Sequence, residues 1–383
     1  MKGQWLGKYS VTNENGEMLN DNGSLRLDID EVDDHFEAVA YIHPSDTNLL
    51  RRVVFFKTDS VLPEQHVSAI IAPIHPNTGL MCTWDEIKKI YSDISYSSSV
   101  NLNIKKTGNS LAISGVTDIE LSVSSELNNS PSNTYSSISG EKMSWLDFKN
   151  HISSISKSKK QYLFRGQQQP WALRTSFHRL GRYRLNEFIE KDVKKLHQRL
   201  SAITSHYFDL NKPEQNGAFF NLLQHHGYPT PLLDWSYSPY VAAFFAFRDW
   251  PKMPIENKAV RIYYFDYPSW QKHFPQFTVL ESPFLHLSVM EFIAIGNPRI
   301  VPQQSVTTTT NVDNIERYLL KQEEETGNKF IHAIDIPYTE RNEVMAELRY
   351  MGITAATMFP GIDGVCEELM EVNFGHLIPP LTT

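Results

Sequence analysis

Two short stretches of this chain place polar side chains within strongly apolar surroundings. The first, residues 162–167, is an apolar run that ends on Arg165 and a glycine. The second, residues 222–247, carries Asp234 and Ser236 just before a long apolar run. Burying a charge or a hydroxyl group without a partner costs several kcal/mol. We therefore expect these polar residues to serve a function.

Arg165 has two interpretations. A guanidinium holds an anion with two parallel hydrogen bonds, which lysine cannot do as specifically. The alternative is a buried pair with Asp234 that holds the core together, and such a pair needs good geometry merely to be neutral. Asp234 could also position a substrate nucleophile or cap the amides of Tyr237 and Ser238. We favour a functional Arg165, because no stability argument prefers arginine over an apolar residue at a strand end.

His225 and His226 are candidates for a general base and a ligand. Adjacent helical residues point about 100° apart, so only one of them can face a given site. The alternative is that one caps the helix C-terminus and interacts with its dipole. Too few further ligands accompany them for zinc. A Gly-x-Ser-x-Gly elbow and a phosphate-binding glycine-rich loop are both missing, which argues against serine hydrolases, kinases and P-loop enzymes.

Mixed strands and helices position these residues. Residues 161–165 read as a buried strand, and residues 185–207 as a long amphipathic helix. A helix from residue 216 or 218 to His226 ends at Gly227, and Ser238 caps a buried helix that runs to Phe247. Further expected elements are an extended piece at 173–177, a segment at 288–295, strands at 259–264, 329–336 and 353–359, and helices opening at Ser144 and spanning 340–351 and 365–372.

Residues 1–125 differ from the rest of the chain. Short β-favouring segments with period-two alternation follow one another, and Asn15-Gly16 and Asn22-Gly23 are turn signals. This pattern predicts a small β-barrel or sandwich. One helix at 83–91 begins with a capping box. No reactive cluster is evident, so we expect a binding or autoinhibitory module. Residues 126–142, rich in Ser and Asn, are expected to be a linker.

Composition narrows the class of protein. The longest apolar run, residues 240–247, is far too short to span a membrane, and the N-terminus lacks a signal-peptide core. Cys82 and Cys366 stand far apart, so we expect a cytoplasmic protein without disulfides or a cysteine metal site. The net charge is −8, yet residues 142–199 hold 14 Lys and Arg against 4 acidic residues. This basic segment predicts either a nucleic-acid substrate or a helix face that pairs with the acidic remainder.

Five ordered motifs resemble the FRG domain family, which is named after its Phe-Arg-Gly run. They cover about residues 143–375, and we assign residues 143–383 to the domain. The family implies a fold neighbourhood and a context in bacterial toxin or anti-phage systems. The motifs are Phe164-Arg165-Gly166-Gln167; residues 222–227; residues 232–239 with Ala242-Ala243; Arg299-Ile300 with Gln303-Gln304; and Gly352-Ile353-Thr354 with Phe359-Pro360-Gly361 and Gly364.

The same stretches are similar to ADP-ribosyltransferases of the Arg-Ser-Glu type. Arg165-Gly166 resembles their first element, and Ser236-Tyr237-Ser238 with the following helix resembles the second. The resemblance implies that Arg165 holds the pyrophosphate or ribose of NAD and that Ser236 orients the nicotinamide ribose. The expected NAD-binding residues are Phe164, Arg165, Gly166, His226, Thr230, Asp234, Ser236 and Ser238.

The third element of such transferases is a catalytic glutamate, and here the corresponding position offers Gln303 and Gln304. Glutamine can hydrogen-bond the ribose without supplying charge. Glu291 and Glu347 could come close in space. We expect Arg165, Ser236, Gln304 and Glu291 to be the catalytic residues.

The sequence thus predicts an α+β protein in which a β-rich module precedes an ADP-ribosyltransferase-like FRG domain. The predicted activity is NAD-dependent, metal-free transfer of ADP-ribose to a macromolecule, with RNA favoured over protein. A toxin or anti-phage effector with a neutralising antitoxin protein, and without membrane contact, is the expected context. The alternatives are a non-catalytic sensor or scaffold and, ranked lower, a nuclease that uses Asp234 and His225.

Overall fold

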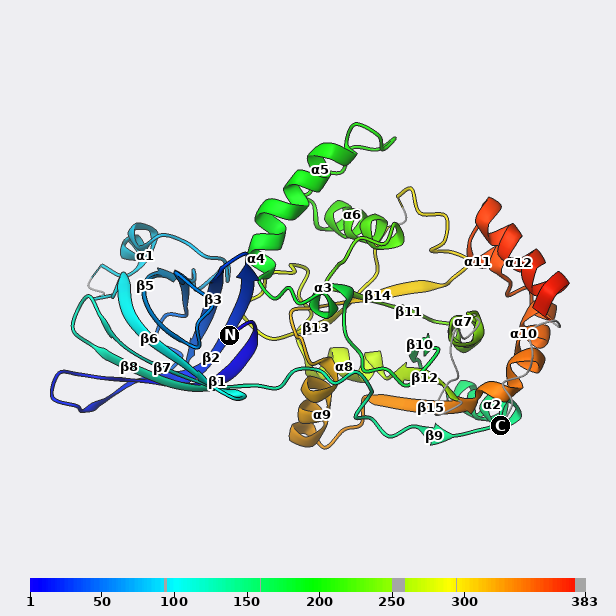
Figure 1. The fold of residues 1–383 in the computed structure, drawn as a ribbon, viewed down its shortest axis with the longest axis horizontal. Coiled ribbons are helices and arrows are strands. Elements are labelled where there is room, and N and C mark those ends of the chain that lie inside the picture. The colour runs from blue at the N-terminus through cyan, green and yellow to red at the C-terminus, as the bar shows by residue number, and fades with distance from the viewer. Residues whose placement is uncertain (93–94, 159, 250–258, 294, 376–383) are drawn as a thin grey trace.

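The N-terminal region is a closed antiparallel barrel of eight strands (Figure 1). Each strand pairs with the next along the chain, and β8 pairs with β1 to close the barrel. The computed structural model describes residues 1–92, 95–158, 160–249, 259–293 and 295–375. The strands are β1 (Gly3–Thr12), β2 (Met18–Val32), β3 (His35–Pro44), β4 (Arg52–Lys57), β5 (Glu64–Pro73), β6 (Ser99–Thr107), β7 (Ser110–Thr117) and β8 (Ser122–Asn129).

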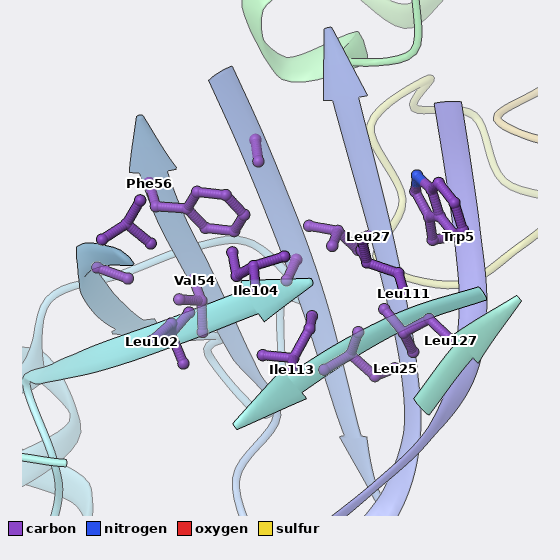
Figure 2. Close-up of a cluster of buried hydrophobic side chains, with 14 of the residues drawn as sticks. Trp5, Leu25, Leu27, Val54, Phe56, Leu102, Ile104, Leu111, Ile113 and Leu127 are labelled. Carbon is purple, nitrogen blue, oxygen red and sulfur yellow. The ribbon is translucent and has the colours of Figure 1, made fainter. Parts of the chain in front are cut away.

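Alternation along the strands builds the barrel core. Leu25, Leu27 and Ile29 of β2 point inward and belong to one apolar cluster, part of which Figure 2 shows. Arg26 and Asp28, which lie between them, face outward. They are nevertheless buried, because the second region of the chain covers this face of the barrel. The expected barrel or sandwich is therefore a barrel.

Three local predictions in this region can be compared with the structure. The capping box is confirmed, since Thr83 and Glu86 exchange hydrogen bonds at the start of α1 (Trp84–Ile90). Asn22-Gly23 was expected to form a turn, but it lies inside β2, where Gly23 pairs with both neighbouring strands. β8 extends to Asn129, into the expected linker. The division of the chain at residues 125 and 142 itself stays a prediction.

The second region is a mixed α/β structure around a seven-stranded sheet of order β13-β14-β11-β10-β12-β15-β9. Neighbouring strands are antiparallel except β15 and β9. The strands are β9 (Glu141–Lys142), β10 (Leu163–Gln167), β11 (Leu232–Ser236), β12 (Ala259–Phe265), β13 (Leu287–Met290), β14 (Ser305–Thr310) and β15 (Ile331–Pro337). The helices are α2 (Trp145–Lys157), α3 (Ser176–Arg179), α4 (Leu185–Glu187), a π-helical stretch (Phe188–Val193), α5 (Lys194–Leu200), α6 (Pro213–His225), α7 (Pro239–Phe247), α8 (Tyr267–His273), α9 (Ile315–Thr326), a 3-10 turn (Tyr338–Glu340), α10 (Arg341–Tyr350), α11 (Ala355–Met358) and α12 (Ile362–Phe374).

Helices cover both faces of this sheet (Figure 1). One face of β10, β12 and β15 packs against α2, α7 and α10. The opposite face packs against α8 and α9, with Trp270 and Leu319 fully buried. The expected caps are confirmed: Ser144 caps α2, Ser238 caps α7, and Gly227 follows α6 with a φ of +79°.

Three predicted elements differ from the structure. The helix expected at 185–207 instead comprises α4, the π-helical stretch and α5, and it ends at Leu200, whose carbonyl accepts hydrogen bonds from the amides of Ile203 and Thr204 and from the Thr204 hydroxyl. The strand expected at 353–359 is wrong, since Thr354 caps the short helix α11 there. The extended piece expected at 173–177 runs into α3, which Thr175 caps.

Polar contacts join the barrel to the second region. The buried Asp30 carboxylate accepts hydrogen bonds from the Tyr183 amide at 2.6 Å and from Arg182 Nε at 2.9 Å. Gln4 donates to the Asn311 carbonyl at 2.8 Å, and Arg26 donates to the Ser282 carbonyl at 3.2 Å. Across the described ranges, none of the helices has both the length and the apolar character that a membrane span requires.

Candidate functional site

Five of the predicted site residues line one pocket of about 380 Å³ in the second region. Strands β10 and β11, helices α6 and α7 and the chain before β14 contribute to its walls. These five residues are Phe164, Arg165, Gly166, Asp234 and Ser236. Its size lies within the range of about 300–1,000 Å³ typical of small-molecule sites.

Arg165 reaches the pocket from the middle of β10. Its Nη1 donates to the Asp234 main-chain carbonyl at 2.7 Å, whereas its buried Nε has no hydrogen-bond partner. Burial lowers the pKa of Arg165, the Asp234 carboxylate opposes this shift, and the nearby positive charge of Arg179 adds to it. Arg165 contacts Asp234 mainly through a carbonyl group, so its charge is only partly compensated.

Gly166 has a packing role. A Cβ at this position would lie 1.8 Å from the Ala242 carbonyl oxygen, because β10 lies directly against α7. Glycine is thus the residue that lets β10 and α7 approach each other.

Two further arginines line the pocket, Arg179 at the end of α3 and Arg299 before β14. Among the described residues, neither they nor Arg165 has a carboxylate oxygen within 4.0 Å. The guanidinium of Arg299 lies over the Phe359 ring at 4.9 Å. Burial lowers the pKa of Arg179 and of Arg299, and neighbouring guanidinium groups add to both shifts. Three partly desolvated cations without an ion pair favour an anionic ligand.

Asp234 supplies a carboxylate to the same pocket. Its surface is open to the pocket, yet the surrounding protein raises its pKa, and a hydrogen bond from Gln224 and the charge of Arg165 oppose that shift. Thr230, which was expected to bind a cofactor, is fully buried and donates to the Gln224 side-chain oxygen. Thr230 therefore orients Gln224 instead of lining the pocket.

Ser236 lies on the pocket wall with its hydroxyl already engaged. The hydroxyl donates to the Gln303 carbonyl at 2.7 Å and accepts from the Ser238 amide at 3.0 Å. Ser238 is the N-cap of α7 and does not line the pocket. Gln303 lines it and donates to the Met358 carbonyl, whereas Gln304, with a φ of +46°, is exposed and outside the lining. The predicted role of Gln304 thus lacks a position in the pocket.

The two glutamates considered for catalysis also lie outside the pocket lining. Glu291 is exposed beyond the end of β13, where the Tyr237 hydroxyl donates to it. Glu347 on α10 accepts hydrogen bonds from the Trp145 indole at 2.9 Å and from Lys149. Both carboxylates already have hydrogen-bond partners away from the pocket.

Of the histidine pair, His225 lines the pocket and His226 is exposed outside it. The rings meet edge to face, 4.8 Å apart. Burial lowers the pKa of His225 to about 4, with the charge of Arg299 adding to the shift. His225 is therefore neutral at pH 7 and offers a hydrogen bond in place of charge, whereas His226, which was predicted to bind NAD, lies outside the pocket lining.

Several arginines of the basic segment pair with carboxylates. Arg182 and Arg184 bind Asp30 and Glu37 of the barrel, and Arg174 binds Asp313 at 2.6 Å. Arg182 and Arg184 therefore join the barrel to the second region. Arg174 holds the loop after β14 within the second region. Within the described residues, no three His, Cys, Asp or Glu side chains come together as a possible metal site.

Comparison with known proteins identifies the domain. Residues 160–253 match the family model of the FRG domain, so the C-terminal part of the chain contains an FRG domain. No curated protein matches the chain. Solved structures similar to it include the redesigned beta barrels b11L5F_LGL (14% identity, 34% of this chain and 91% of that chain, TM-score 0.22) and mFAP0 bound to DFHBI (15% identity, 33% and 97%, TM-score 0.22).

Sequence reasoning missed several residues of the pocket. Arg299 belongs to a motif of the family resemblance, but its side chain was not assigned to the site. Arg179 had no signal beyond the excess of basic residues in segment 142–199. The other lining residues that were not assigned to the site are Gln167, Gln168, Trp171, Asn221, Gln224, Trp235, Ala242, Phe245, Asp249, Asn297, Ile300, Ser305 and Phe359.

Proposed function

We propose that the FRG domain binds NAD in this pocket and transfers ADP-ribose to a macromolecule. The observation that carries the proposal is the convergence of Arg165, Arg179 and Arg299, none of which has a carboxylate oxygen of the described residues within 4.0 Å. A pyrophosphate carries two negative charges and accepts paired hydrogen bonds from guanidinium groups. The mixed sheet is consistent with an ADP-ribosyltransferase-like fold, which we include in the proposal.

The remaining walls suit the other parts of a dinucleotide. Trp171, Phe245 and Phe359 supply aromatic surface against which a nicotinamide or adenine ring can pack. Asn221 and His225 supply neutral hydrogen-bonding groups. A pocket that combines cations, aromatic faces and amides matches a nucleotide better than a simple inorganic anion.

The chemistry needs one negative group near the reacting carbon. In ADP-ribosyl transfer the bond from the nicotinamide nitrogen to ribose C1′ breaks, and nicotinamide leaves with the bonding electron pair. A nucleophilic oxygen or nitrogen of the acceptor then bonds to C1′ and releases its proton. We assign to Asp234 the stabilisation of the cationic ribose in the transition state, because its carboxylate lines the pocket beside Arg165.

Nucleic acid, RNA in particular, remains the proposed acceptor. Lys195 and Arg199 on the exposed side of α5 support it, since no carboxylate of the described residues lies within 4.0 Å of either. Arg174, Arg182 and Arg184 pair with carboxylates, so fewer basic residues of segment 142–199 are free to bind nucleic acid than the sequence alone indicates. Activity of this kind would suit a toxin or anti-phage effector that an antitoxin protein neutralises.

A second candidate is a sensor that binds a nucleotide without turnover. The observation that favours it is that no glutamate of the described residues lines the pocket, although transferases of this type use one. In such a sensor the Asp234 carboxylate would have no catalytic role. It would only balance part of the positive charge of the arginines while no nucleotide is bound.

Calorimetric titration of the full chain with NAD tests the binding step. We expect saturable binding that weakens by at least about tenfold, or about 1.4 kcal/mol, in Arg165→Ala. The matched control is Arg317→Ala, which removes an exposed arginine of α9 outside the pocket and should leave binding unchanged. Equal NAD affinity in wild type and Arg165→Ala, or no binding at all, would overturn the assignment. Nicotinamide release then separates the transferase from the sensor.

A further inference from the structure

The barrel interior is not uniformly filled. The large buried side chains of Trp5, Phe36 and Leu127 pack in one part of the core and do not line a cavity. In another part the barrel contains a cavity of about 90 Å³. Barrels of eight strands are just wide enough either to be filled by side chains or to hold one small ligand. In this barrel, side chains fill one part of the interior, and the cavity leaves room for a small ligand in another part.

The cavity wall is almost entirely apolar. Leu25, Val54, Leu102 and Ile113 line it, and Figure 2 shows these side chains pointing toward a common interior. Small residues, among them Ala40, stand where larger inward-facing side chains would close the space. The volume has room for roughly six groups of the size of a water molecule, since one such group needs about 10–15 Å³. Apolar cavities of this kind stay dry and bind apolar molecules.

The cavity adjoins a wider space at the barrel mouth. That space measures about 550 Å³ and shares Asp21, Arg52, Ser97 and Leu121 with the walls of the cavity. Trp84 lies at the mouth, stacked on Tyr96 with ring centroids 4.1 Å apart. A molecule too long for the enclosed part can therefore extend outward along aromatic surface.

A polar cluster lies where the two spaces meet, since Asp21 and Arg52 line both of them. The Tyr9 hydroxyl donates to Asp21 Oδ1 at 2.6 Å, and Arg52 Nη2 donates to the same oxygen at 2.5 Å. All three residues line the cavity. The opposite charges of Asp21 and Arg52 compensate each other, so the cluster offers hydrogen bonds without a net charge. A neutral polar group on a ligand would be held here more readily than a free ion.

We propose that the barrel binds a small, uncharged, mainly apolar molecule, with its ring or chain in the cavity and one hydrogen-bonding group beside Tyr9, Asp21 and Arg52. This site is separate from the FRG pocket, and no residue lines both. The inference does not depend on NAD binding or on transferase activity. It makes the barrel a ligand-binding module attached to the FRG domain.

The probe for the test is N-phenyl-1-naphthylamine, an uncharged aromatic amine whose fluorescence rises in apolar surroundings. Titration of the full chain should show saturable binding. Ala40→Leu adds three carbon atoms inside the cavity and should weaken binding by at least about tenfold. Ser125→Leu fills the cavity from β8, since Ser125 shares the inward face with the fully buried Leu127.

The matched control is Ser114→Leu, which makes the same change on the exposed outer face of β7. It should bind the dye as wild type does. Thermal unfolding of each variant shows whether the barrel is intact, and the two filling variants act from different strands. Undiminished dye binding in both folded filling variants would overturn the proposal, as would failure of the wild-type chain to bind the dye.

Discussion

Replacing Gly166 by alanine tests why the second residue of the Arg165-Gly166 pair must be glycine. The added Cβ would lie 1.8 Å from the Ala242 carbonyl oxygen. Real Cβ atoms essentially never come closer than 3.0 Å to such a neighbouring atom. Helix α7 would have to move away from β10 by more than about 1 Å. It cannot do so freely, because Ala242, Ala243 and Phe244 are almost fully buried.

The cost of such overpacking is typically about 1–3 kcal/mol. We expect the upper end, about 3 kcal/mol, because the clash is with main-chain atoms. For a region of this size the melting temperature should fall by about 6–12 °C, at about 2–4 °C per kcal/mol. Differential scanning calorimetry of the full chain measures this shift.

Gly227→Ala is the control for Gly166→Ala. No atom lies within 4 Å of its added Cβ, so the substitution meets only the strain of a φ of +79°. That strain costs about 1–2 kcal/mol. A Gly166→Ala protein that melts at the wild-type temperature, or no lower than Gly227→Ala, would refute the packing explanation.

Three further predictions concern charge. His178 and His286 have pKa values lowered by burial to about 3 and about 4, so the free energy of unfolding should be level above pH 6.5 and decrease from about pH 6.5 toward pH 4. Denaturant unfolding at pH 7 and pH 5 measures this, and equal stability at both would contradict it. Asp30→Ala should destabilise the chain by about 3 kcal/mol and speed proteolysis, because the amide of Tyr183 loses a buried acceptor; an unchanged melting temperature would contradict it. Asp234→Asn should lower the rate of nicotinamide release about 100-fold while NAD still binds, and an unchanged rate would exclude Asp234 from catalysis.

Much of the fold followed from local patterns. Alternation of residues such as Leu25, Leu27 and Ile29 predicted the strands, and the caps Ser144 and Ser238 predicted where two helices begin. The sequence did not distinguish a closed barrel from a sandwich. Closure depends on pairing between β1 and β8, which are more than 100 residues apart in the chain. Local patterns also failed at 353–359, where an apolar run typical of a strand forms a capped helix turn.

The site was predicted only where a polar residue stands within or beside an apolar run of the sequence. Arg165, Asp234 and Ser236 lie on neighbouring strands, and their apolar surroundings drew attention to them. Arg179 and Arg299 come from distant segments that only the folded sheet brings together. Glu291 was expected near the pocket from chain order alone, but it lies beyond β13 at the edge of the sheet, where Tyr237 binds it.

The most direct test of the account is transfer of label from NAD carrying a radioactive adenosine. The purified chain is incubated with this NAD and with total RNA, DNA or cell lysate, beside Arg165→Ala and Arg317→Ala. We predict label on one class of acceptor, RNA first, with an equal amount of nicotinamide released. This activity should disappear in Arg165→Ala and persist in Arg317→Ala. A wild-type chain that binds NAD but yields neither label nor nicotinamide would contradict the transferase and leave the sensor.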